Sequence, residues 1–184
     1  MTSAEFLGDY PTRVRAYLHR AENAVKGLDA TAINARPAGA VLSIGQILEH
    51  LALGAEGYVS PMNHALVKAK KSTADKALHF TFFGKLIIKA AGPDGKGPMP
   101  KKLVPGPGPY GPEVLDRFKN AFEDIIAIAE GCKGMDLGSA TIRNPIVSFI
   151  TMNLADCFAI QEAHAKRHVA QIEAQVKAAT ARPS

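Results

Sequence analysis

The chain has 184 residues, 47% of them hydrophobic, and a formal net charge of +5. This length suits one domain with a buried core, and the basic residues are spread over many segments. The densest cluster, Lys68, Lys70 and Lys71, has no interleaved aromatic residues to stack on bases, so we expect no nucleic-acid partner.

Neither the cysteines nor the apolar stretches indicate an extracellular or membrane protein. Cys132 and Cys157 alone make no disulfide framework, and "MTSAEFLGDYP" lacks the pattern of a signal peptide. The longest apolar stretch, "HFTFFGKLIIKAAG", is too short and interrupted to span a bilayer. We therefore expect a reduced, cytoplasmic, soluble protein without a membrane partner.

Apolar residues recur at helical spacing in the first part of the chain. One stripe runs from Val14 to Leu28, and Pro11 suits the start of that helix. A second helix is predicted from Ser43, a good N-cap residue, through Tyr58. Pro61 is expected to kink this helix or to end its regular part, although "NHALVKAKK" could extend it.

Two more helices are predicted in the second half. The third runs from about Pro112 to Glu130, with Gly131 as its C-terminal stop. The fourth is long, from about Ser148 to Ala179. The short run "NPIVSFIT" could be a strand, but we expect it to lead into this fourth helix.

An unusual connection separates the second and third helices. Residues 91–112 are rich in Gly and Pro and cannot form a regular helix or a central strand. The apolar residues just before them, 80–88, predict a short helix packed on the bundle or between two subunits. The predicted fold is therefore all-α: a single domain over residues 1–184, a four-helix bundle with an excursion at about 79–112.

His164 and His168, in "HAKRH", are the first candidates for metal ligands. Residues four apart share one face of a helix, so two imidazoles can converge on one ion. Two ligands hold a metal weakly, and a third has to come from elsewhere. A pair like this also arises by chance, and His19, His64 and His79 are interpreted as surface or incidental residues.

His50 is the best candidate for the third ligand. It lies within the apolar stripe of the second helix, although a core histidine bonded to a carbonyl is an alternative. Gly54, one turn further on, costs helix stability, which indicates a need for space there, either for close packing or for a ligand. Gln46, one turn before His50, is a candidate to orient an imidazole.

The face of the fourth helix that carries the histidine pair is unusually polar. Counting back at 100° per residue places Gln161, Cys157 and Asn153 on it. Gln161 could orient an imidazole, and Cys157 could face the site or be a small buried hydrophobe. No phosphate-binding loop, dinucleotide motif, nucleophile elbow or zincin motif is present, and no general base is identifiable.

Three features together resemble the DinB-like superfamily of bacterial four-helix-bundle metalloproteins. "RPAGAVLSIGQILEHL" is similar to the start of that family's second helix, which ends in a ligand histidine. "RNPIVSFITMNLADCFAIQEAHAKRHVAQI" is similar to the lead into its fourth helix and the paired histidines. The order of the helices also agrees, but Leu42 stands where the family often has Trp, which alters packing rather than ligation.

The resemblance implies metal ligation by His50, His164 and His168. It implies a divalent ion, usually zinc or nickel, and frequently a homodimer. Related enzymes include thiol-dependent transferases and isomerases, which implies a small-molecule substrate and a low-molecular-weight thiol. We expect a metal-dependent enzyme that activates a thiol or, as a hydrolase, water; a non-enzymatic bundle that senses or binds a metal or small molecule stays open.

Overall fold

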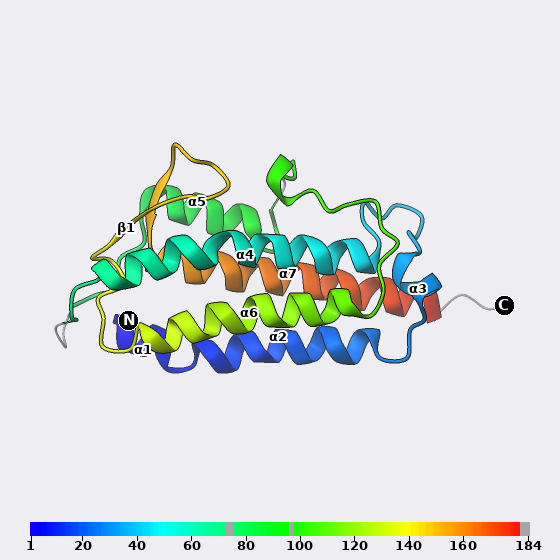
Figure 1. Cartoon of the computed structure of the whole chain (residues 1–184), viewed down its shortest axis with the longest axis horizontal. Helices are drawn as coiled ribbons and strands as arrows, with labels where there is room; N and C mark the ends of the chain where they lie inside the picture. Colours follow the sequence, from blue (N-terminus) through cyan, green and yellow to red (C-terminus); the bar gives the residue numbers. More distant parts are fainter. Residues whose placement is uncertain (73–75, 96–97, 181–184) are drawn as a thin grey trace.

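The computed structural model describes residues 1–72, 76–95 and 98–180. Four long helices lie along one another in Figure 1: α2 (Tyr10–Val25), α4 (Ile44–Lys68), α6 (Glu113–Gly131) and α7 (Leu154–Thr180). Helices α4 and α2 each pack against both α6 and α7. The chain thus forms a helical bundle, and each of its four long helices overlaps one that is predicted from the sequence.

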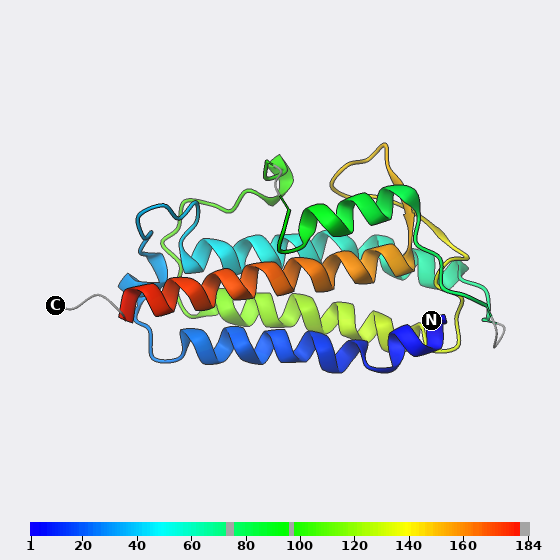
Figure 2. The ribbon, with the colours of Figure 1, turned by 180° about the vertical axis from the view of Figure 1, so that it is seen from behind.

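The directions of the four helices explain the long connection. The colours in Figures 1 and 2 show that α4 and α6 run the same way, while α2 and α7 run the opposite way. A helix of 25 residues such as α4 is about 37 Å long. Because α6 begins beside the start of α4, the chain has to return along the whole bundle before α6 can form.

Short elements occupy the connections. They are α1 (Ser3–Gly8), α3 (Ala30–Asn34), α5 (Phe82–Ala91) and the 3₁₀ helix η1 (Lys101–Leu103). The short helix predicted after residue 80 is α5, which packs against α7. Residues 73–75 and 96–97 of this long return, and residues 181–184 of the predicted domain, lie outside the described part of the chain.

A buried carboxylate fixes α5 to the start of α7. Asp156 is fully buried and accepts hydrogen bonds from the Thr81 backbone N–H (3.0 Å) and the Thr81 hydroxyl (2.7 Å). A Cβ atom on Gly84 would lie 2.0 Å from Asp156 Oδ1, so only glycine fits there. This contact holds α5 in place as a wall beside α7.

Two expectations are wrong in the region before α7. The fold is not entirely helical, and the last helix does not start near Ser148. Strands β1 (Thr141–Arg143) and β2 (Thr151–Asn153) form an antiparallel hairpin in which Ile142 faces Met152 across the ladder. Asn153 Oδ1 accepts from the Asp156 N–H, and Asp156 Oδ2 accepts from the Asn153 N–H. This reciprocal capping starts α7 at Leu154, so "NPIVSFIT" belongs to the hairpin.

The bundle interior is apolar. Its largest fully buried side chains include Leu48, Leu51, Phe118, Phe122 and Phe158. Helix α4 continues through Pro61 to Lys68, beyond the kink or end expected at this proline. None of the described helices is long and apolar enough to cross a membrane.

Candidate metal centre

The three histidines singled out in the sequence meet between α4 and α7. His50 comes from α4, and His164 and His168 lie one turn apart on α7. Their ring centroids are 4.7 Å apart in every pair, and all three side chains are buried. Each offers one ring nitrogen within 4.8 Å of the other two.

A backbone carbonyl fixes the orientation of His50. His50 Nδ1 lies 2.7 Å from the carbonyl oxygen of Leu103, in η1. Because a carbonyl can only accept, Nδ1 carries the proton and Nε2 keeps its lone pair. That Nε2 lies 2.9 Å from Nε2 of His164, toward the centre of the cluster.

The other two rings are held by different contacts. His168 Nδ1 lies 2.7 Å from Gln171 Oε1, which again leaves the lone pair on Nε2. The His164 ring packs on Gly54, where a Cβ atom would lie 3.0 Å from the ring carbon Cε1. Gly54 therefore provides space for the His164 ring itself.

Burial keeps all three rings uncharged near neutral pH. It lowers the pKa of His50, and it lowers that of His164 well below the ordinary value, with His168 and His50 adding to the effect. Burial and the neighbouring His50 lower the pKa of His168 to about 3. Neutral imidazoles present lone pairs, which is the form that binds a metal ion.

The donor set fits a metal ion. Ligand nitrogens about 2.0–2.1 Å from a tetrahedral zinc lie roughly 3.3 Å apart. The Nε2 atoms of His50 and His164 are 2.9 Å apart, and the candidate ligand nitrogens of the three rings all lie within 4.8 Å of one another. In the described part of the chain, this is the one cluster of three or more His, Cys, Asp or Glu residues with suitable spacing. Three protein ligands leave a coordination position free, as in catalytic zinc sites.

A cavity of about 670 Å³ opens on the histidines. Its walls are mostly apolar and come from α4, α5, α7, the loop before α4, the segment around η1 and the hairpin loop. Arg167 is the one charged side chain among the described lining residues, and its Nη1 donates to the Ala90 carbonyl at 3.2 Å. The cavity is large enough for a drug-sized molecule next to the three histidines.

Three of the other candidate residues lie in structural contacts outside the cluster. Gln46 completes the N-terminal capping box of α4 with Ser43, and its Nε2 donates to the Gly106 carbonyl at 3.3 Å. Asn153 caps α7 and donates to the His79 carbonyl. Cys157 is fully buried and does not line the cavity, and burial raises the pKa of its thiol well above the usual value.

Gln161 lies beside the cluster. It is 1% exposed, lines the cavity, and donates from Nε2 to the Gly54 carbonyl at 3.4 Å. Its Oε1 has no hydrogen-bond partner among the described residues, although it is buried. A buried acceptor without a donor costs free energy, so this oxygen needs an explanation.

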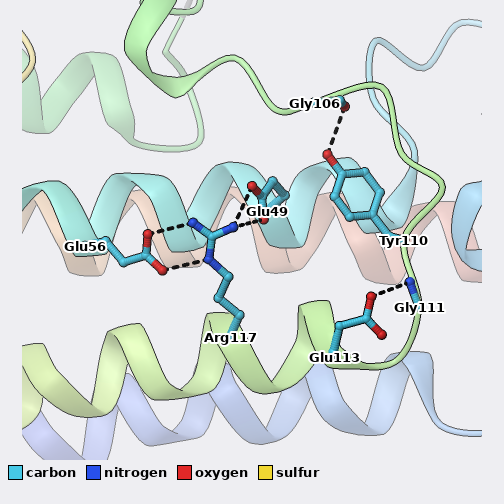
Figure 3. A network of polar contacts seen from close by, with 7 residues as sticks. All are labelled: Glu49, Glu56, Gly106, Tyr110, Gly111, Glu113 and Arg117. Atoms are coloured by element: carbon cyan, nitrogen blue, oxygen red, sulfur yellow. Dashed lines mark hydrogen bonds and ion pairs between the residues drawn. The ribbon is translucent and has the colours of Figure 1, made fainter.

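The Glu49 side chain points away from the histidines, unlike that of its neighbour His50. Figure 3 shows Arg117 of α6 between Glu49 and Glu56 of α4, with its Nη1 2.7 Å from both Glu49 carboxylate oxygens. Nearby, Tyr110 packs against Gly45 and donates to the Gly106 carbonyl, which fastens the segment between η1 and α6 to α4. Glu49 therefore joins two helices and does not reach the histidines.

Two contacts of the cluster were missed from the sequence. The acceptor at Leu103 is a backbone atom, so its residue type carries no signal. Gln171 could have been found, because residues three apart on a helix are neighbours and a glutamine amide can accept from an imidazole. His19, His64 and His79 are exposed, away from the cluster.

No curated protein and no solved structure matches the chain. One family does match, the DinB superfamily, over residues 13–172. This span runs from early α2 to late α7 and includes all three buried histidines. The chain belongs to the DinB superfamily.

Proposed function

We propose that the protein is a divalent-metal-dependent enzyme that activates a thiol, or alternatively water, at His50, His164 and His168. One observation carries the proposal: three buried, neutral imidazoles converge at the wall of a cavity of about 670 Å³. A bound divalent ion with a free coordination position lowers the pKa of a thiol or water and creates a nucleophile near neutral pH.

The chain's own residues position the reaction. Leu103 and Gln171 hold two of the imidazoles through their protonated nitrogens, so the unprotonated nitrogens point at one place. The apolar walls exclude water from the substrate. In the transferase reaction, the thiol sulfur forms a new bond to an electrophilic carbon, the leaving group departs with its electron pair, and the thiol proton goes to solvent.

Metal analysis tests the site. Purified protein is expected to hold about one zinc or nickel ion per chain, measured by inductively coupled plasma mass spectrometry. His50→Ala and His164→Ala should lose that metal, while His64→Ala, an exposed histidine on the same α4, should keep it. Full metal content in both cluster variants would contradict the proposal.

A turnover screen then separates the enzyme from its alternatives. Metal-loaded protein is assayed with glutathione, cysteine and other small thiols against activated aryl and alkyl halides, and with ester substrates in the absence of thiol. Metal-dependent thioether formation supports the transferase, and metal-dependent ester cleavage supports the hydrolase. Stoichiometric metal without any turnover in either assay indicates a binding or sensing module.

A further inference from the structure

The cavity continues past the histidines to an end where none of the described lining residues is charged. Gly54 and Tyr58 follow His50 on α4 by one and two turns, which places Tyr58 about 12 Å further along the axis. Gln161 precedes His164 on the oppositely directed α7, so it is displaced the same way and reaches the Gly54 carbonyl. All of these residues line the cavity.

At this end, Tyr58 has a hydroxyl proton to donate. Asn144 Oδ1 accepts from the backbone N–H groups of Ile146 and Val147, both at 2.8 Å, which fixes the orientation of the Asn144 amide. Its Nδ2 therefore donates to the Tyr58 hydroxyl oxygen at 3.0 Å. Within the described residues, no acceptor lies within hydrogen-bond reach of the Tyr58 O–H itself.

Gln161 supplies the complementary group. Its Nε2 faces the Gly54 carbonyl, so the unpartnered atom is the acceptor Oε1. Burial raises the pKa of Tyr58, so its hydroxyl keeps the proton and stays a donor. The cavity end thus holds one buried donor and one buried acceptor on separate side chains, both uncharged.

We propose that this end of the cavity is a ligand subsite for an uncharged amide group, in which Tyr58 donates to the amide oxygen and Gln161 accepts from the amide N–H. An amide carries an acceptor and a donor on the two heteroatoms of its carbonyl carbon, whereas an ester or a carboxylate offers acceptors alone. The apolar wall formed by Ile146, Val147 and Ile160 suits the adjoining aliphatic chain. This inference rests on the proposed function, because it describes the far end of the molecule whose near end reacts at the histidines.

Binding of three small probes tests the subsite. Hexanamide, methyl hexanoate and hexanoate are titrated into metal-loaded protein, and dissociation constants are taken from NMR chemical-shift changes. We expect hexanamide to bind about tenfold more tightly than the ester, the gain typical of one satisfied buried hydrogen bond, and the charged hexanoate most weakly. Equal affinity for the amide and the ester would overturn the proposal, and would mean that water alone satisfies the two side chains.

Variants assign the preference to its residues. Gln161→Leu should weaken hexanamide about tenfold and leave methyl hexanoate unchanged, while Tyr58→Phe should weaken both, because both probes accept from the hydroxyl. Gln175→Leu is the matched control, since Gln175 lines the same cavity from α7 and also has a buried, unpartnered Oε1. An amide preference that persists in Gln161→Leu, or disappears in Gln175→Leu, contradicts the assignment.

The subsite and the proposed function can fail separately. If the His164→Ala protein, lacking metal, still prefers the amide, the subsite stands whatever the metal analysis shows. If Gln161→Leu changes metal affinity and leaves the amide preference intact, Gln161 serves the metal centre and the subsite is refuted. The melting temperature of metal-free Gln161→Leu should stay close to that of the wild type, because removal of the unpaired buried acceptor offsets the loss of the long hydrogen bond from Nε2 to the Gly54 carbonyl.

Discussion

The His50 ring on α4 and the Leu103 carbonyl in η1 are joined by a hydrogen bond of 2.7 Å, so a candidate metal ligand depends on the segment between α5 and α6 for its orientation. Leu103 itself is anchored by burial of its side chain. Leu103→Gly should loosen this anchor and lower metal affinity by roughly tenfold or more, the usual effect of losing a partner of a ligand histidine. Competition with a chelating dye measures the change.

The neighbouring residue provides the control for that experiment. Val104 is 55% exposed, and Val104→Gly adds similar backbone freedom one residue away. It should bind the metal like the wild type. Equal metal affinity in Leu103→Gly and Val104→Gly would show that anchoring of the Leu103 backbone does not affect how His50 is held.

Gln171 should tune the metal centre through His168. Gln171→Leu removes the acceptor for Nδ1 and is expected to weaken metal binding by about 10- to 100-fold. Gln171→Glu keeps an acceptor oxygen and should retain binding. The two chelator-competition curves are compared directly, and loss of binding in both variants would point to a change in packing instead.

Lowering the pH should destabilise the metal-free protein at pH values that are still above those at which carboxylates titrate. The pKa of His168 is about 3 in the folded protein against 6.5 for a free histidine, so between these values the unfolded chain binds a proton that the folded chain does not. The free energy of unfolding therefore falls as pH falls, by about 2 kcal/mol between pH 7 and pH 5 from this residue.

Urea unfolding after chelator treatment, at pH 7 and pH 5, measures this dependence. His168→Gln should reduce it, while the exposed His64→Gln should not. Equal unfolding free energies at the two pH values in the wild type would contradict burial of neutral rings.

Arg117 tests whether Glu49 belongs to the metal centre. Arg117→Met breaks the bridge between Glu49 and Glu56 seen in Figure 3 and should lower the unfolding free energy by no more than about 1 kcal/mol, because the groups are partly exposed. Metal content should be unchanged. Arg15→Met, which removes a similar pair with Glu123, should match it in both measurements.

The homodimer stays a prediction, and α5 is where we expect the copies to meet. Phe82, Phe83 and Leu86 are exposed there, at 73%, 46% and 51%. Light scattering should give twice the mass of one chain for the wild type and for Val67→Ser, another exposed apolar residue, and a reduced mass for the double variant Phe82→Ser, Leu86→Ser. A monomeric wild type would contradict it.

The long helices and the histidine cluster could be predicted because both depend on side-chain periodicity. An apolar stripe specifies which face of α4 is buried, and His50 lies on that face; the spacing of His164 and His168 fixes their common direction. The hairpin was missed because its strands have three residues each, too few for a period-two pattern to stand out. The reciprocal capping of Asn153 and Asp156 was the available signal for the true start of α7.

The parallel course of α4 and α6 has an evolutionary consequence. Because α4 and α6 are parallel, the connection between them has to run back along the bundle. This connection contains Leu103, and its residues from α5 to η1 cover the cavity. The contacts among α2, α4, α6 and α7 are made by the four helices themselves. The lining of the cavity can therefore change by replacement of a loop, while the three buried histidines stay on α4 and α7.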